Sequence, residues 1–207
     1  MYVREAKKQL RSKMKTMLME LSPESIQFQS EKVHEKLLNL EKFKESKKIA
    51  LYMSMPHEIQ TIKIIESCFL SNKTVYLPKC NYEASYGRKK GHLHMLKVNS
   101  FGEVLNLRPQ GRFKILEPTD GQDILQTGEL DIIIVPGVAF DLERKRLGHG
   151  AGFYDEFLRA YYNKFGKTPF LVGLGLKEQA VQQIPTEEHD WKLDCLVLPE
   201  RNIIFSI

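Results

Sequence analysis

The sequence contains few cysteines and no long hydrophobic run. Only three of its 207 residues are cysteine, they lie far apart, and none belongs to a C-x-x-C pair: Cys68, Cys80 and Cys195. This pattern disfavours a disulfide scaffold and indicates reduced thiols in an intracellular protein. No apolar segment approaches the roughly 20 residues that span a bilayer, so we expect no transmembrane helix and no membrane partner.

A secretory signal peptide is also missing, because no apolar core precedes a small-residue cleavage site. The first turns are instead basic, with Arg4, Lys7, Lys8 and Arg11 among their cations. We therefore expect a cytoplasmic protein. A mitochondrial presequence is the alternative, which Glu5 and the scarcity of serine disfavour.

An excess of charge of one sign is absent as well. The net charge is +5, from 31 Lys and Arg against 26 Asp and Glu. A modest positive charge suits an anionic substrate such as a nucleotide, and it also suits weak nucleic-acid affinity. No motif interleaves aromatic and basic residues as RNA-binding sheets do, so we expect no stable nucleic-acid complex. The length and the 42% hydrophobic content fit a single domain over residues 1–207, which we expect to be monomeric.

Strands and helices are predicted to alternate along much of the chain. Short apolar runs predict strands over residues 49–54, 74–79, 92–98, 130–137, 169–176, 195–199 and 202–207. The remaining periodic segments predict helices over 4–21, 22–40, 61–70, 152–165 and 177–184. Residues 81–91 are predicted to form a loop, and residues 99–129 mostly connections. This β-α-β order is typical of a parallel sheet with helices on its faces.

The strongest local signal is the stretch RLGHGAGFYD, from Arg146 to Asp155, between a predicted buried strand and a predicted helix. A helix start presents unpaired N–H groups, and glycines allow backbone to approach a ligand closely. The stretch matches neither the P-loop nor the dinucleotide fingerprint. It predicts a phosphate-binding turn, and the alternative is a tight turn with no ligand.

Three acidic positions are candidates for a site. Asp155 lies in the first turn of the predicted helix 152–165, where it could ligate Mg²⁺ beside phosphates or only stabilise the helix dipole. Asp190 ends the acidic stretch 187–190, whose alternative interpretation is a solvated loop. Glu58 follows the first predicted strand, where open α/β sheets bind ligands, although it could equally be a helix-start acid.

Histidine and lysine spacing adds two further observations. His92 and His94 would share one face of a strand, but nothing in the spacing supplies a third and a fourth ligand, so no zinc site is predicted. Lys7 and Arg11 lie one helical turn apart, so both could reach one anion. The alternative for that helix is an ordinary solvated face.

Taken together, these segments closely resemble a known family. The string VPGVAFD....RLGHGAGFYDEFL resembles the signature of the 5-formyltetrahydrofolate cyclo-ligases, also called methenyltetrahydrofolate synthetases. Supporting segments in the same order are KKQLR, YMSMPHEIQT, VYLPK, ILEP and EEHDWKLD, so the resemblance extends from about Lys7 to about Leu198. It implies a three-layer α/β/α fold with a mostly parallel central sheet. It also implies conversion of 5-formyltetrahydrofolate, with or without a polyglutamate tail, to 5,10-methenyltetrahydrofolate, with ATP as co-substrate and Mg²⁺ as cofactor.

The resemblance also implies roles for individual residues. The implied nucleotide contacts are Lys7, Lys8, Arg11, Arg146, Leu147, Gly148, His149, Gly150, Ala151, Gly152, Phe153 and Tyr154. The implied folate contacts are Met53, Glu58, His149, Gly150, Ala151, Gly152 and Phe153. Asp155 and Asp190 correspond to magnesium ligands, and catalytic roles fall to Arg146 and His149.

The chain departs from the family pattern inside the glycine turn. His149 stands where relatives often have arginine or tyrosine, Ala151 where glycine or lysine is common, and Phe153 where tyrosine is frequent. A neutral imidazole is a weak substitute for arginine, so a cation of the run 144–146 could stabilise the transferred phosphoryl group instead.

Two other functions stay open at this level. One is a non-catalytic relative that binds a nucleotide or RNA, which the retained acidic residues disfavour. The other is an α/β enzyme acting on a sugar phosphate or a CoA-type substrate, which the segment around Met53 disfavours.

Overall fold

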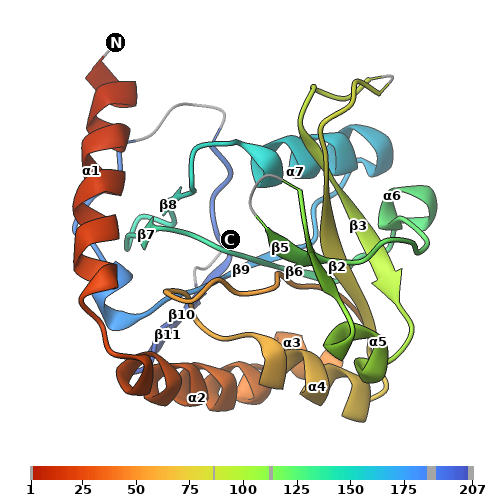
Figure 1. Ribbon diagram of the computed structural model, residues 1–207, viewed down its shortest axis with the longest axis horizontal. Helices are drawn as coiled ribbons and strands as arrows, with labels where there is room; N and C mark the ends of the chain where they lie inside the picture. Colours follow the sequence, from red (N-terminus) through yellow and green to blue (C-terminus); the bar gives the residue numbers. More distant parts are fainter. Residues whose placement is uncertain (1, 86, 112–113, 186–189, 205–207) are drawn as a thin grey trace.

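A seven-stranded sheet runs through the middle of the protein (Figure 1). The computed structural model describes residues 2–85, 87–111, 114–185 and 190–204. In spatial order the strands are β11 (Asn202–Ile204), β10 (Cys195–Val197), β9 (Phe170–Leu174), β6 (Ile132–Val135), β1 (Lys48–Ala50), β2 (Thr74–Asn81) and β3 (His92–Val98). The inner strands run parallel, and the two edge strands β3 and β11 are antiparallel to their neighbours.

Helices cover both faces of this sheet. They are α1 (Tyr2–Met19), α2 (Pro23–Asn39), α3 (Glu41–Glu45), α4 (Ile62–Leu70), α5 (Phe101–Leu105), α6 (Ile124–Thr127) and α7 (Phe153–Phe165). In Figure 1, α2 and α4 lie below the sheet and α7 lies above it. Strand β6 is wholly apolar because it packs both ways: Ile132 and Ile134 join the core under α2 and α4, and Ile133 and Val135 join the core under α7. The expected three-layer α/β/α fold with a mostly parallel sheet is confirmed.

The predicted start of the second helix is confirmed in detail. Ser22 is the N-cap of α2, its Oγ accepts a hydrogen bond from the Ser25 N–H at 3.2 Å, and Pro23 is the first helical residue. Gln29, a polar residue on the buried face of this helix, donates through Nε2 to Glu178 at 3.0 Å. The cap determines where α2 begins, and the Gln29 contact attaches the helix to the segment that carries Glu178.

The second strand extends beyond the predicted range 74–79, and Pro78 lies inside it. Strand β2 continues to Asn81 and pairs with β3 from Val75 to Asn81. The Tyr76 carbonyl accepts from the Leu51 N–H on the β1 side, and Pro78, two residues on, turns its nitrogen to the same side. Strand β1 has already ended at Ala50, so the missing N–H of proline removes no ladder hydrogen bond.

Other element predictions were wrong in length. The strand predicted over 49–54 stops at residue 50, and Thr61 donates its Oγ1 hydrogen to the Tyr52 carbonyl at 2.6 Å instead of capping α4. The helix predicted over 177–184 is a single 3₁₀ turn, η1 (Lys177–Gln179). Beyond it the chain is extended, and the Val181 N–H donates to the Phe140 carbonyl.

Two small sheets lie outside the main one, and the sequence analysis predicted neither. One joins β4 (Arg108–Gln110) to β5 (Ile115–Glu117), inside the region predicted to be mostly connections. The other joins β7 (Ala139–Phe140) to β8 (Arg146–Leu147), and it carries the chain from β6 to the glycine turn. No helix in the described part of the chain is long and apolar enough to cross a membrane.

Candidate functional site

The glycine turn lies between β8 and α7. Gly152 is the N-cap of α7 with a φ of +70°, and Gly150 has a φ of +101°, a backbone region that disfavours other residues. As a glycine, Gly152 has no side chain with which to cap α7. The Nε of Arg11 donates to the Gly148 carbonyl at 2.7 Å, so helix α1 is fastened to the turn. The turn thus presents a helix N-terminus beside a cation.

Two pockets open on either side of this turn. The first, here called the polar pocket, has a volume of about 570 Å³ and is lined by Arg4, Lys7, Arg11, Lys89, Arg146, Leu147, Gly148, Gly150, Gly152, Asp155, Glu156, Arg159 and Asp190. The second, here called the apolar pocket, has a volume of about 320 Å³ and is lined by Tyr52, Met53, Met55, Glu58, Pro78, Cys80, Leu93, Ile115, Glu117, Pro136, Arg146, Gly148, His149, Ala151, Gly152, Phe153, Tyr154 and Asp155. Arg146, Gly148, Gly152 and Asp155 belong to both. The turn is therefore a shared wall across which two bound molecules could react.

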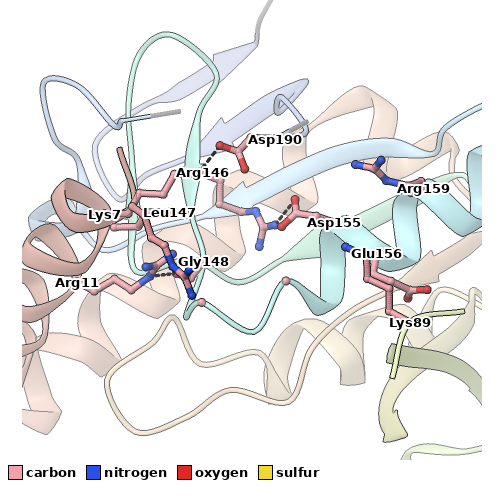
Figure 2. Close-up of a pocket in the computed structure, with 13 residues that line it drawn as sticks. Lys7, Arg11, Lys89, Arg146, Leu147, Gly148, Asp155, Glu156, Arg159 and Asp190 are labelled. Carbon is pink, nitrogen blue, oxygen red and sulfur yellow. Dashed lines mark hydrogen bonds and ion pairs between the residues drawn. The ribbon is translucent and has the colours of Figure 1, made fainter. Parts of the chain in front are cut away.

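The polar pocket is built for an anion. Six cationic side chains line it against three acidic ones. Figure 2 shows Lys7 and Arg11 entering from α1 on one side and Lys89 lying on the opposite side, beside Glu156. The pKa of Arg11 is lowered, because the effect of burial outweighs the opposing effect of the Asp190 charge. A guanidinium partly withdrawn from water interacts more strongly with a bound phosphate than a solvated one.

The two predicted metal ligands line this same pocket. Asp155 accepts a hydrogen bond from Arg146 Nη2 at 3.0 Å, and Asp190 accepts one from Lys7 Nζ at 2.7 Å. Trp191 donates through Nε1 to the Asp155 carbonyl at 3.2 Å, which ties the segment carrying Asp190 to the start of α7. The rest of the acidic stretch, residues 187–189, lies outside the described residues.

Arg146 is the central cation of the site. Its side chain is only 6% exposed, Nη1 donates to the Pro136 carbonyl at 3.0 Å, and its guanidinium lies 5.7 Å from the ring centre of Tyr154. The neighbouring cations point elsewhere: Arg144 donates to the Leu193 carbonyl, and Lys145 pairs with a surface glutamate. Among the described residues of the run 144–146, Arg146 alone lines the pockets.

The apolar pocket contains a carboxylate that contacts the turn. Glu58 accepts a hydrogen bond from the Met55 N–H at 2.9 Å, and its other oxygen lies 3.0 Å from His149 Nε2. Burial, with the nearby Glu58 charge, raises the pKa of both Tyr52 and Tyr154, so these phenols stay neutral in the pocket wall. The pocket thus combines an apolar surface with one hydrogen-bond acceptor attached to the turn.

Most residues predicted to contact ligands line one of the two pockets. Four residues predicted as nucleotide contacts lie only on the apolar side: His149, Ala151, Phe153 and Tyr154. Gly150, predicted to contact both ligands, lies only on the polar side, and Met53 and Glu58 line the apolar pocket. Lys8 lies outside both pockets, on the exposed side of α1, 4.0 Å from Glu5.

Several lining residues were missed by the sequence analysis. In the polar pocket they are Arg4, Lys89, Glu156 and Arg159, and in the apolar pocket the most polar are Cys80 and Glu117. Lys89 had no sequence signal, because it lies in the polar loop 82–91. That loop is attached to α7 by the buried ion pair between Arg88 and Glu156, at 2.6 and 2.7 Å. Glu117 did have a signal, since it is the acid of the ILEP segment.

The histidines of β3 do not form a metal site. Nδ1 of His94 lies 2.6 Å from Asp123, and Nδ1 of His92 lies 2.8 Å from the Lys89 carbonyl. Within the described ranges, no group of three or more His, Cys, Asp or Glu side chains could hold a metal ion by itself.

Comparisons with known proteins show the family of this chain. The model of the 5-formyltetrahydrofolate cyclo-ligase family matches residues 3–199. The 5-formyltetrahydrofolate cyclo-ligase of Saccharomyces cerevisiae is 35% identical over 95% of this chain and 97% of its own, and that of Mus musculus is 33% identical over 93% of each. The solution structure of Aquifex aeolicus 5,10-methenyltetrahydrofolate synthetase superposes with a TM-score of 0.77 at 32% identity, covering 96% of this chain and 92% of that one. The chain therefore belongs to the 5-formyltetrahydrofolate cyclo-ligase family of enzymes.

Proposed function

We propose that this enzyme converts 5-formyltetrahydrofolate to 5,10-methenyltetrahydrofolate, with ATP and Mg²⁺, and releases ADP and phosphate. The observation that carries the proposal is the glycine turn shared by a cationic pocket and an apolar one. The names of the relatives describe the same conversion of folate. In this proposal ATP occupies the polar pocket and the folate ring system occupies the apolar pocket.

The reaction needs activation of an inert formamide. Its carbonyl carbon is a poor electrophile and its oxygen is a poor leaving group. Transfer of the γ-phosphoryl group to the formyl oxygen solves both problems, because the neighbouring folate nitrogen can then attack the carbon. The ring closes, the C–O bond breaks, and the oxygen leaves within phosphate. A well-oriented intramolecular attack can contribute roughly 7–11 kcal/mol to lowering the barrier.

The turn would do this work through charge and position. Phosphoryl transfer depends mainly on alignment and neutralisation of charge. Lys7 and Arg11 would hold the terminal phosphates, and Arg146, which lies between the pockets, would neutralise the moving group. His149 contacts the folate side of the turn through Glu58, so it would orient the formyl end and not the nucleotide.

The chemistry of the acidic side chains fits magnesium. Asp155 and Asp190 supply carboxylate oxygens to one pocket, and Mg²⁺ typically takes one or two carboxylates with the remaining positions filled by phosphate oxygens and water. Such an ion would neutralise phosphate charge when bound. The same carboxylates pair with Arg146 and Lys7.

The direct test is an absorbance assay for methenyl-folate formation. Purified enzyme, 5-formyltetrahydrofolate, ATP and Mg²⁺ should together give the product, and omission of any one should abolish it. Product formation without ATP, or no product from the complete mixture, would contradict the proposal.

The Glu58→Gln variant should raise the KM for folate about tenfold or more and leave the KM for ATP nearly unchanged, because a charged acceptor for folate N–H groups beside the glycine turn is lost. Steady-state kinetics with each substrate varied in turn measures both constants. Equal changes in the two would argue that Glu58 is structural.

Replacing Lys7 and Arg11 together by alanine should weaken ATP binding by about 10- to 100-fold, since two charge-assisted phosphate contacts disappear. Folate affinity should change far less. Calorimetric titration with each ligand measures the difference, and the Lys8→Ala variant, on the exposed side of the same helix, is the matched control. Unchanged ATP affinity in the double variant would mean that α1 only packs against the turn.

A further inference from the structure

A second acidic side chain, Glu117, lies in the wall of the apolar pocket and has no role in the reaction described above. It is 4% exposed, although its carboxyl group borders a space that can hold a ligand. Strand β5 turns Ile115 and Glu117 to the same side, and both line the pocket. The small β4–β5 sheet thus delivers one apolar and one acidic group to the pocket.

The neighbour of this carboxyl group on β2 is Cys80. Burial raises the pKa of Glu117, whereas hydrogen bonding by Cys80 and the charge of Lys79 lower it. Burial likewise raises the pKa of the Cys80 thiol, to about 12, so the sulfur keeps its proton and acts only as a weak donor. A carboxylate can accept about four hydrogen bonds, so Glu117 retains acceptor capacity on the pocket side.

Glu58 is attached to a different wall of the same pocket. Both oxygens of Glu58 are engaged, one by the Met55 N–H and one by the imidazole of the glycine turn. Glu58 is thereby held at the turn, where the formyl group would react. Glu117 contacts β2 instead, and the side chains of Pro78, Cys80 and Leu93 line the same pocket from β2 and β3. The pocket therefore offers acceptors attached to two different walls.

A ligand that complements this wall has a flat ring with apolar faces and N–H donors at one edge. Burying an acidic group without such donors is costly, whereas a charge-assisted hydrogen bond from a ligand N–H offsets the cost. The reduced pterin of the proposed substrate carries an exocyclic amino group and an adjacent ring N–H at one edge, away from the formylated nitrogen.

We propose that Glu117 is a specificity-determining residue that accepts hydrogen bonds from the amino edge of the pterin ring. Glu58 then contacts the ring at the end nearer the glycine turn. This inference rests on the proposed function, because it takes 5-formyltetrahydrofolate as the occupant of the apolar pocket.

The test is a calorimetric titration of 5-formyltetrahydrofolate, without ATP, into the wild type and the Glu117→Gln and Glu117→Asp variants. Both variants should weaken folate binding by about 10- to 100-fold, because each loses one hydrogen bond to a charged group. ATP affinity and the Tm should stay near wild-type values, which shows that the variants fold. The Glu35→Gln variant, in the exposed part of α2, is the control for loss of one negative charge.

A folate analogue that lacks the exocyclic amino group identifies the contact. It should bind the wild type more weakly than the parent folate, and Glu117→Gln should weaken it little further. Folate affinity unchanged in both folded variants, or equal losses for folate and the analogue, would overturn the role of Glu117. If the role of Glu117 is overturned but the wild type still binds and converts folate, the proposed function stands. If the wild type binds no folate, the proposed function and the role of Glu117 are both overturned.

Discussion

The Asp155→Asn variant should lose at least about 100-fold in kcat while keeping its fold. An amide is a weaker ligand than a carboxylate for a hard cation such as Mg²⁺. It also removes the charge that Arg146 contacts at 3.0 Å in the wall between the pockets. Asparagine matches aspartate in size, so the packing of the first turn of α7 should change little.

Turnover measured as a function of Mg²⁺ concentration checks this prediction, with thermal unfolding as the measure of fold. Magnesium affinity measured by calorimetry in the presence of a non-hydrolysable ATP analogue should fall as well. The Glu143→Gln variant, in an exposed ion pair with Lys145, is the matched control and should behave as wild type. An unchanged kcat with normal magnesium dependence would refute a metal role for Asp155 and leave only its effect on the helix dipole.

The Arg146→Lys variant should lower kcat by about 100- to 1000-fold at nearly unchanged ATP affinity. Lysine keeps the positive charge but not the planar fork, which here donates to both the Pro136 carbonyl and Asp155. A single ammonium cannot replace both contacts and still face the two pockets. The loss should therefore fall on the chemical step.

Single-turnover kinetics with saturating ATP and folate separates that step from binding. The neighbouring Lys145→Arg change is the matched control, because Lys145 lies outside both pockets and should tolerate it. If Arg146→Lys retained wild-type single-turnover rates, another group would have to neutralise the transferred phosphoryl charge.

The parts of the site that are local in sequence could be predicted from sequence. The run of apolar residues in β6, the glycine turn and the start of α7 follow one another within about 25 residues, and each has its own signal in composition and spacing. Asp155 could be placed in the first helical turn for the same reason. The cap of α2 was likewise predicted, since capping depends on neighbouring residues only.

The parts that depend on tertiary packing could not be predicted in this way. Lys7 and Asp190 pair across 183 positions of sequence, and only the docking of α1 beside the turn brings them together. The segment 177–184 has a helical pattern, but Gln179 turns inward and donates to the Gly137 carbonyl at 2.6 Å, which favours a short turn and an extended chain. Glu117 lies in a region of glycines and prolines, and its small sheet packs against β2, a contact distant in sequence.

The division of the turn into two faces is likewise a property of the fold. The sequence places His149, Gly150, Ala151 and Gly152 in one string, and the family resemblance implies contacts to both ligands for all of them. In the structure His149 and Ala151 line the apolar pocket, and Gly150 lines the polar one. Alternation along a glycine-rich turn thus gives the two pockets different lining residues, a distinction that spacing does not reveal.

The most direct test of transfer across this turn follows the formyl oxygen itself. Substrate labelled with oxygen-18 in the formyl group is converted in the presence of ATP and Mg²⁺, and the released phosphate is examined by mass spectrometry. The account predicts one labelled oxygen in each phosphate formed, because the formyl oxygen accepts the phosphoryl group and leaves with it. Unlabelled phosphate, with the label released to water, would show that ATP cleavage and ring closure are not joined across the turn.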